Sequence, residues 1–364
     1  MAMASISMMT MAQSTLGSGL NVADFDKSVR PGDDFYAYAC GGWMKSHPLP
    51  AAYSRYGSFD RLQEDNDKRI NAILKELESN TYEKGTIEQK LSDLYKLAMD
   101  STRRNQEGVA PLMPLIKRLE AAKTNKQLLA IQLEKAPYGE QEFFFCSFGA
   151  DDKNATQNIL NVYQGGLSLG QKEYYLDNDK ATADIREAFK KHVVKMFQLF
   201  GFSKSAATKK MQNIMKVETA LAKVSKSRTE LRDPEANYNK MTLKEFEANY
   251  PNLPLVKVMN AQGVDTKYLQ EMVVGQPAFL EGANKLVGSI KPAEYRDVME
   301  WGFINDAANY LSDATVAEKF DFNGRIRSGR KENHPLWKRS TSQVERLEGG
   351  TLTVHLPLEC TALT

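Results

Sequence analysis

Residues 182–201 read TADIREAFKKHVVKMFQLFG. Apolar side chains recur there at intervals of three or four, which places them on one face of a helix. They are Ile185, Phe189, Val193, Phe197 and Phe200. The glycine that follows, Gly201, can adopt the left-handed conformation that ends a helix. The stretch therefore predicts a helix that buries one face in a core. His192 lies beside that face, and we expect it to be a partly exposed helix residue rather than a metal ligand.

The same pattern recurs along most of the chain. Apolar residues from Phe59 to Leu77 predict a second helix, and residues 203–224 predict a third. Further helices are expected to begin at capping-box sequences. These are Thr86 to Gln89, Thr124 to Gln127 and Thr242 to Glu245.

A shorter helix is expected near the N-terminus. Phe35, Tyr38 and Trp43 have helical spacing, and Gly41 and Gly42 stand together before the tryptophan. Because glycine readily takes the left-handed conformation, we expect this helix to end at the two glycines.

One segment has the pattern of strands. Residues 142–149 (EFFFCSFG) and the alternating residues 158–163 flank a turn-forming segment, residues 150–154. Cys146, in the first run, is expected to be a small buried hydrophobe rather than a reactive thiol. The predicted fold class is mainly α, a large multi-helix domain with a small β-hairpin.

Composition and charge exclude several classes of protein. The chain has 364 residues, with 48 Lys and Arg against 46 Asp and Glu, so its formal net charge is +2. No basic stripe interleaved with aromatic residues is present, which argues against a nucleic-acid partner. No run of eighteen apolar residues occurs, so no transmembrane segment is predicted.

The N-terminal residues suggest export. Residues 1–12 carry no charge and are apolar or small, and a polar segment follows them. Residues 1–13 are therefore predicted to be the remnant of a secretory signal whose basic start is missing, and residues 14–30 a lead-in linker. The alternative is a disordered, Met-rich start. On the first interpretation the protein is periplasmic, extracellular or at the cell surface.

The residues present predict no catalytic or metal-binding centre. The histidines are His47, His192, His334 and His355; no two are four residues apart, and no His-Glu-x-x-His occurs. The cysteines, Cys40, Cys146 and Cys360, are isolated from one another. Residues 166–170 (GLSLG) match the pattern around a hydrolase nucleophile, but the surrounding chain lacks the strand–turn–helix context that such a serine requires.

Several segments resemble the neprilysin/endothelin-converting-enzyme family of zinc metallopeptidases. They occur in family order and span residues 25–345. The segments are residues 33–43 (DDFYAYACGGW), 54–60 (SRYGSFD), 164–169 (QGGLSL), 230–234 (ELRDP), 320–324 (FDFNG) and 337–339 (WKR). The third segment also accounts for the isolated GLSLG pattern.

This resemblance implies a role in proteolysis. Residues 31–346 resemble the N-terminal, mainly helical domain of the family, which roofs a cavity that admits oligopeptides and excludes folded proteins. The zinc ligands and catalytic residues of the family lie in its C-terminal half. The chain is therefore expected to be the substrate-gating half of a secreted zinc endopeptidase and to be inactive alone, with the catalytic lobe as a possible partner. The alternative is a non-catalytic helical module that binds peptides or acts as a decoy.

Two residues are candidate substrate-binding residues by the same resemblance. Arg55 matches the arginine that reaches the C-terminal carboxylate of a peptide, a role suited to the planar guanidinium because it can pair with both oxygens. Asp60 matches an acidic position near it. A structural alternative for Asp60 is a place in the first turn of its helix, where a negative charge is favourable.

The resemblance ends near residue 346. Residues 347–357 (LEGGTLTVHLP) contain two adjacent glycines, β-branched residues and a proline, so their helix propensity is poor. Residues 347–364 are therefore predicted to be an atypical tail, and our hypothesis for its origin is a frameshift or premature end. Relatives in the family pair the cysteine that corresponds to Cys40 with one near the far C-terminus, so Cys40 is expected to be unpaired unless it bonds to Cys360.

Overall fold

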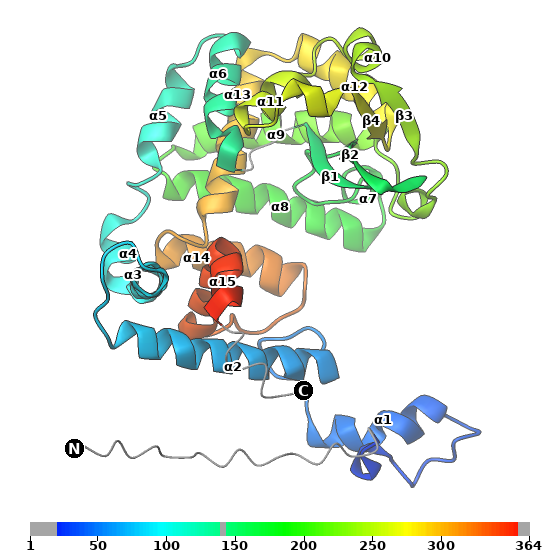
Figure 1. The fold of residues 1–364 in the computed structure, drawn as a ribbon, viewed down its shortest axis with the longest axis vertical. Helices are drawn as coiled ribbons and strands as arrows, with labels where there is room; N and C mark the ends of the chain where they lie inside the picture. Colours follow the sequence, from blue (N-terminus) through cyan, green and yellow to red (C-terminus); the bar gives the residue numbers. More distant parts are fainter. Residues whose placement is uncertain (1–19, 139–142, 356–364) are drawn as a thin grey trace, which may run out of the picture.

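Two hydrophobic cores organise the helices in the computed structural model, which describes residues 20–138 and 143–355. The fold is mainly helical, as predicted, with a small sheet on the larger core (Figure 1). The predicted signal remnant, Cys360 and the last residues of the predicted tail lie outside the described residues.

The smaller core joins segments that are far apart in sequence. Helices α2 (Ser58–Glu78), α3 (Ile87–Met99) and α15 (Leu336–His355) pack together, with α4 (Ser101–Glu107) beside them (Figure 1). Their buried side chains are Ile70, Leu74, Leu77, Leu91, Tyr95 and Val344. Only the second half of α2 contributes to this core, because Phe59 and Leu62 in its first turns are 85% and 66% exposed.

The larger core lies under a body of helices. The long helix predicted from residues 182–201 is α8, and it packs against α9, which in turn packs against α12 and α13. The helices of this body are α5 (Met113–Ala121), α6 (Asn125–Lys135), α7 (Glu173–Leu176), α8 (Lys180–Leu199), α9 (Lys204–Val224), α10 (Leu243–Asn249), α11 (Leu255–Ala261), α12 (Pro277–Ser289) and α13 (Pro292–Ala307). The 3-10 turns η2 (Ala136–Tyr138), η3 (Glu230–Arg232) and η4 (Thr266–Leu269) connect them.

The predicted hairpin is present within a larger sheet. Strand β1 (Phe144–Asp151) pairs antiparallel with β2 (Asn154–Gln164), with Cys146 opposite Val162. Two strands of four residues each complete the order β1-β2-β4-β3: β4 (Glu271–Val274) pairs parallel with β2, and β3 (Asn239–Thr242) pairs antiparallel with β4. Burial raises the pKa of the Cys146 thiol to about 12, consistent with an unreactive thiol.

A π-helical turn adds Phe322 to the larger core. Helix α14 (Asp313–Phe320) runs directly into η5 (Asp321–Ile326), whose hydrogen bonds span five residues. A Cβ atom at Gly324 would lie 2.2 Å from the ring of Phe320, so a larger residue there would have to displace that ring. The turn therefore explains the glycine in the FDFNG segment.

Helix boundaries confirm the predicted caps. The side chain of Thr86 accepts a hydrogen bond from the Gln89 backbone at the start of α3, and complete capping boxes open α6 at Thr124 and α10 at Thr242. Helix α8 ends before Gly201, whose φ is +88°.

The predicted end of the first helix is wrong. Helix α1 (Phe35–Ser46) continues through Gly41 and Gly42. These glycines allow close packing instead: a Cβ atom at Gly42 would lie 2.3 Å from the carbonyl oxygen of Ala23, next to the turn η1 (Val22–Asp24). Helix α15 continues to His355, into the segment for which poor helix propensity was predicted.

Replacing Gly42 by alanine tests this close contact. Alanine is favoured over glycine inside a helix by about 1 kcal/mol, so the substitution would stabilise α1 if no contact opposed it. We expect Gly42→Ala to displace residues 22–26 and to accelerate tryptic cleavage after the exposed Lys27, followed by mass spectrometry. Gly32→Ala is the control, because a Cβ atom there meets nothing within 4 Å. Equal cleavage rates for Gly42→Ala and the parent protein would contradict the proposed packing.

Candidate functional site

The two predicted substrate-binding residues lie at the start of α2. Arg55 is exposed and makes no hydrogen bond or ion pair with the other described residues. Asp60 accepts a hydrogen bond from the backbone nitrogen of Gly57 at 2.9 Å and so closes the first turn of α2. The two side chains are therefore close in sequence but not bonded to each other, and the helix-capping role expected as the alternative for Asp60 is present.

The loop that carries Arg55 is attached to the start of α15. The hydroxyl of Tyr53 accepts a hydrogen bond from Lys338 at 2.6 Å, and its ring lies edge-on to that of His334 at 5.0 Å. The backbone nitrogens of Lys331 and Glu332 donate to the carbonyl oxygen of Ala51. Arg55 is therefore two residues, at most about 7 Å of backbone, from a residue whose side chain contacts His334 and Lys338.

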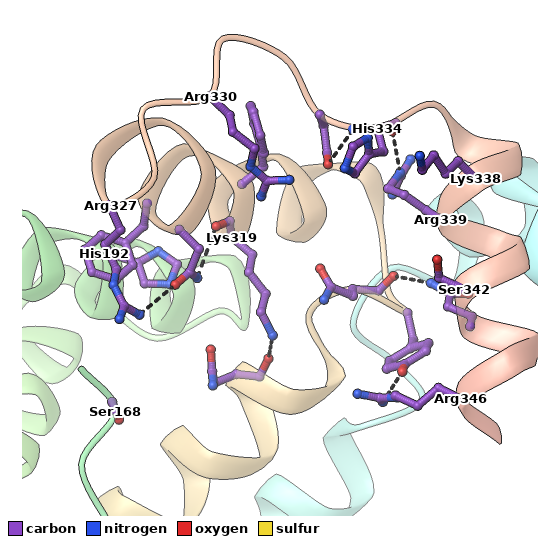
Figure 2. A pocket seen from close by; sticks show the side chains of 18 of the residues that line it. Ser168, His192, Lys319, Arg327, Arg330, His334, Lys338, Arg339, Ser342 and Arg346 are labelled. Carbon is purple, nitrogen blue, oxygen red and sulfur yellow. Dashed lines mark hydrogen bonds between the residues drawn. The ribbon is translucent and has the colours of Figure 1, made fainter. Parts of the chain in front are cut away.

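His334 and Lys338 also line a cavity of about 530 Å³ between the larger body and α15. Its walls come from the loop at Ser168, from α8, α13 and α14, from η5 and the loop that follows it, and from α15 (Figure 2). The volume is within the range of small-molecule and peptide pockets, about 300–1,000 Å³.

The lining of this cavity is strongly basic. Six cationic side chains and two histidines line it, and none of the lining residues is an aspartate or a glutamate. The cations are Lys319, Arg327, Arg330, Lys338, Arg339 and Arg346. Among the described side chains, Lys338 alone of the six lies within ion-pair distance of a carboxylate, that of Asp67 at 3.0 Å and that of Glu64 at 3.9 Å.

The unpaired cations are held by neutral groups. Lys319 donates to the carbonyl oxygen of Asn305, and Arg346 donates to the hydroxyl of Tyr310. Arg339 donates to the carbonyl oxygen of His334 at 3.1 Å, while the guanidinium of Arg330 lies over the ring of Phe320 at 5.3 Å. These contacts orient the positive charges without neutralising them.

Positive charges close to one another lower the pKa values of His334 and Lys319. Burial lowers the pKa of His334, and the nearby Lys338 and Arg330 lower it further. Burial likewise lowers the pKa of Lys319, with an added contribution from Arg346 that opposes the attraction of Asp306. The cavity therefore favours a bound negative charge.

Ser168 lies in the wall of the cavity but is not placed as a nucleophile. Its hydroxyl donates to Glu218 at 2.6 Å and accepts a hydrogen bond from the Trp301 indole nitrogen at 2.8 Å. Tyr175 donates to the second oxygen of Glu218 at 2.5 Å. Burial raises the pKa of Glu218 to about 7. These contacts make the GLSLG segment a structural support.

His192 is buried, which contradicts the expectation of partial exposure. Its Nδ1 atom lies 2.9 Å from the Oε1 atom of Glu318, and its ring stacks on Phe322 at 4.9 Å. The prediction was wrong because the buried face of α8 is widened by α14 and η5, which cover the side of the helix next to the apolar stripe.

The described residues do not fit a zinc ion. One group of three acidic side chains, Glu120, Asp297 and Glu300, brings one oxygen of each within 4.8 Å of the others. The ammonium of Lys210 occupies the centre of this group and donates to all three carboxylates, at 2.5, 3.0 and 2.6 Å. The cations of Lys210 and Arg296 already pair with these carboxylates, and the cluster contains no imidazole or thiolate, so it does not resemble a structural or catalytic zinc site.

Sequence reasoning missed the cavity because its lining residues are spread along the chain from Ser168 to Arg346. One local signal was present: residues 325–331 contain four Lys and Arg side chains directly after the FDFNG segment. That signal does not reveal which of these side chains face inward, since Arg325 pairs with Asp321 and lies outside the cavity lining.

Comparisons with known proteins agree on one family. The sequence model described as Peptidase family M13 matches residues 31–354. Human endothelin-converting enzyme 1 is 30% identical over 341 residues, which cover 91% of this chain and 44% of that protein. Mouse neprilysin is 25% identical over 360 residues, covering 89% of this chain and 46% of its own length. The chain thus spans less than half the length of these relatives.

A solved structure has the same fold. Mycobacterium tuberculosis zinc metalloprotease Zmp1, in complex with an inhibitor, matches with a TM-score of 0.87 and 26% identity. The match covers 94% of this chain and 52% of the Zmp1 chain. In the part of this chain that the structure describes, no helix is both long enough and apolar enough to cross a membrane.

The buried carboxyl of Glu218 predicts a pH-dependent stability. Its pKa is higher in the folded chain, about 7, than the ordinary value of 4.5, so its favourable contribution is complete below pH 4.5 and is lost as the pH rises to about 7. We expect this loss to amount to about 3 kcal/mol of unfolding free energy, measured by urea denaturation.

In Glu218→Gln the change in unfolding free energy between pH 4.5 and pH 7 should be smaller by that amount. Glu300, whose pKa burial raises to about 8, contributes equally to both proteins, so the difference between them isolates Glu218. Glu247→Gln, at an exposed position, is the matched control. An unchanged pH profile in Glu218→Gln would show that this carboxyl is not perturbed.

Proposed function

Because the chain belongs to peptidase family M13, we propose that it forms the N-terminal, substrate-admitting half of a zinc endopeptidase that acts on oligopeptides. The observation that carries this proposal is the family match over residues 31–354 in a sequence without a His-Glu-x-x-His motif. The zinc ion then belongs to a catalytic half that this sequence does not contain, and no step of zinc chemistry is assigned to the described residues.

Arg55 is proposed as the residue that binds the C-terminal carboxylate of the peptide. Its exposure and its lack of a carboxylate partner among the described residues support this role, since the guanidinium is available to pair with both oxygens of a ligand. Asp60 is bonded to the Gly57 backbone, so its proposed contribution is to hold the turn that presents Arg55.

We propose that the catalytic half covers the exposed apolar side chains around α1 and α2. Phe35 and Tyr36 on α1 and Phe59 and Leu62 on α2 are each more than 60% exposed. A grouping of large apolar side chains on one region is typical of a surface that is covered in the assembled protein.

A second candidate function is a non-catalytic module that binds peptides. The unpaired Arg55 favours it, because carboxylate binding by this residue does not require the catalytic half. Export from the cell is part of the proposal, and its support is the uncharged, apolar or small composition of residues 1–12.

Because the proposal assigns the zinc site to the catalytic half, it predicts that the purified 364-residue chain is inactive. We expect elemental mass spectrometry to find less than one zinc ion per chain, and we expect no cleavage of a fluorogenic oligopeptide. A full-length family peptidase, assayed in parallel, controls for the substrate. Zinc bound at one ion per chain together with turnover would refute the assignment of the active site to another half.

The role of Arg55 predicts a loss of peptide affinity on substitution. Arg55→Ala should weaken binding of a peptide with a free C-terminus by about tenfold, because one charge-assisted bidentate pair is removed. C-terminal amidation of the peptide should produce the same loss. For the amidated peptide, Arg55→Ala should cause no further loss of affinity. Arg69→Ala, at an exposed position on α2, is the charge-matched control, and an equal loss there would indicate only a change in net charge.

A further inference from the structure

We propose that the basic cavity binds the carboxylate side chains of acidic oligopeptides and so selects peptides that contain Asp or Glu. This inference rests on the proposed function, in that it assigns a substrate class to the same peptide-admitting half. It concerns a cavity separate from Arg55.

The first argument is the local imbalance of charge. The chain as a whole has a formal net charge of only +2, yet six cations and no carboxylate line this cavity. Five of the six have no carboxylate within ion-pair distance among the described side chains. A carboxylate brought among them gains charge-assisted hydrogen bonds and relieves repulsion between the cations.

The second argument is the arrangement of the donors. Arg330 and Arg346 come from opposite sides of the cavity, one from the loop after η5 and one from α15, and Lys319 extends between them from α14 (Figure 2). Neutral contacts hold Arg346 and Lys319 in place. The cationic groups are thus oriented before a ligand binds, which lowers the entropic cost of binding.

The third argument is size. A cavity of about 530 Å³ is much larger than a single free anion, given that a water molecule occupies about 30 Å³ of liquid volume. Besides the cations, Asn309, Asn333 and Gln343 line it and offer amide groups that can bond to a peptide backbone. A segment of peptide with a charged side chain fits this combination better than inorganic phosphate does.

The fourth argument is the position of the cavity beside Arg55. Tyr53 contacts both His334 and Lys338 in the cavity wall and lies two residues from Arg55. A peptide held at its C-terminus by Arg55 would therefore start from a loop that is anchored to the wall of the cavity. The acidic side chain then binds in the cavity while the C-terminal carboxylate binds at Arg55.

The experiment compares two peptides that differ only in charge. Both are acetylated and amidated, one with two adjacent Glu residues and the other with Gln in their place, so neither presents a terminal carboxylate to Arg55. Titration calorimetry with the full 364-residue chain should show binding of the Glu peptide about tenfold tighter than that of the Gln peptide, decreasing with added salt.

Two variants locate the binding. Arg330→Gln and Arg346→Gln should each abolish most of the difference between the peptides, while Lys331→Gln, which removes the same charge from an exposed position outside the cavity lining, should preserve it. The Arg330 side chain makes no hydrogen bond to the described residues, so its replacement should leave the circular dichroism spectrum unchanged.

The outcomes separate this inference from the proposed function. Equal affinity for the two peptides, or an equal loss in Lys331→Gln, would overturn it. Tight binding of inorganic phosphate that displaces the Glu peptide at similar concentration would assign the cavity to a small free anion and would also overturn it. Zinc-dependent cleavage by this chain, or peptide binding unaffected by Arg55→Ala, would instead contradict the proposed function. Neither result bears on the cavity, because binding of the amidated peptides requires neither catalysis nor Arg55.

Discussion

The buried carboxyl of Glu218 is the contact on which the arrangement of the cavity depends. It accepts hydrogen bonds from Ser168 and Tyr175, and Trp301 donates to the same Ser168 hydroxyl. These bonds join α9 and α13 to the loop that follows β2. Because a buried polar group that loses its partner is costly, the loop cannot move away without leaving Glu218 unsatisfied. One wall of the basic cavity is held by this network.

Two clusters of charge in the same domain have opposite character. Lys210 is surrounded by Glu120, Asp297 and Glu300, so its positive charge is neutralised inside the protein and joins α5, α9 and α13. In the cavity the side chains of Arg330 and Arg346 make their close contacts with neutral groups, the ring of Phe320 and the hydroxyl of Tyr310. The paired cluster is structural, whereas cations without a carboxylate partner at an open cavity can bind a negatively charged ligand.

Sequence reasoning predicted the features that local physics controls. Helix starts at Thr86, Thr124 and Thr242 were predictable because a cap satisfies backbone groups within one turn. The hairpin of β1 and β2 was predictable from its alternation and turn. The short strands β3 and β4 were not, because four residues carry little pattern and their pairing is with distant segments. Gly42 was misjudged because its neighbour, Ala23, lies on another element.

By itself the sequence determined the fold class, the family, and the absence of a His-Glu-x-x-His motif in this chain, since each of these depends on residue identity and spacing. It also singled out Arg55 as a candidate binding residue. Only the tertiary structure decided that His192 is buried, that Asp60 caps α2, and that cations from α14, α15 and the loop between them share one cavity. The physical reason is that burial and charge imbalance arise from side chains far apart in sequence, and no local pattern records which of them meet.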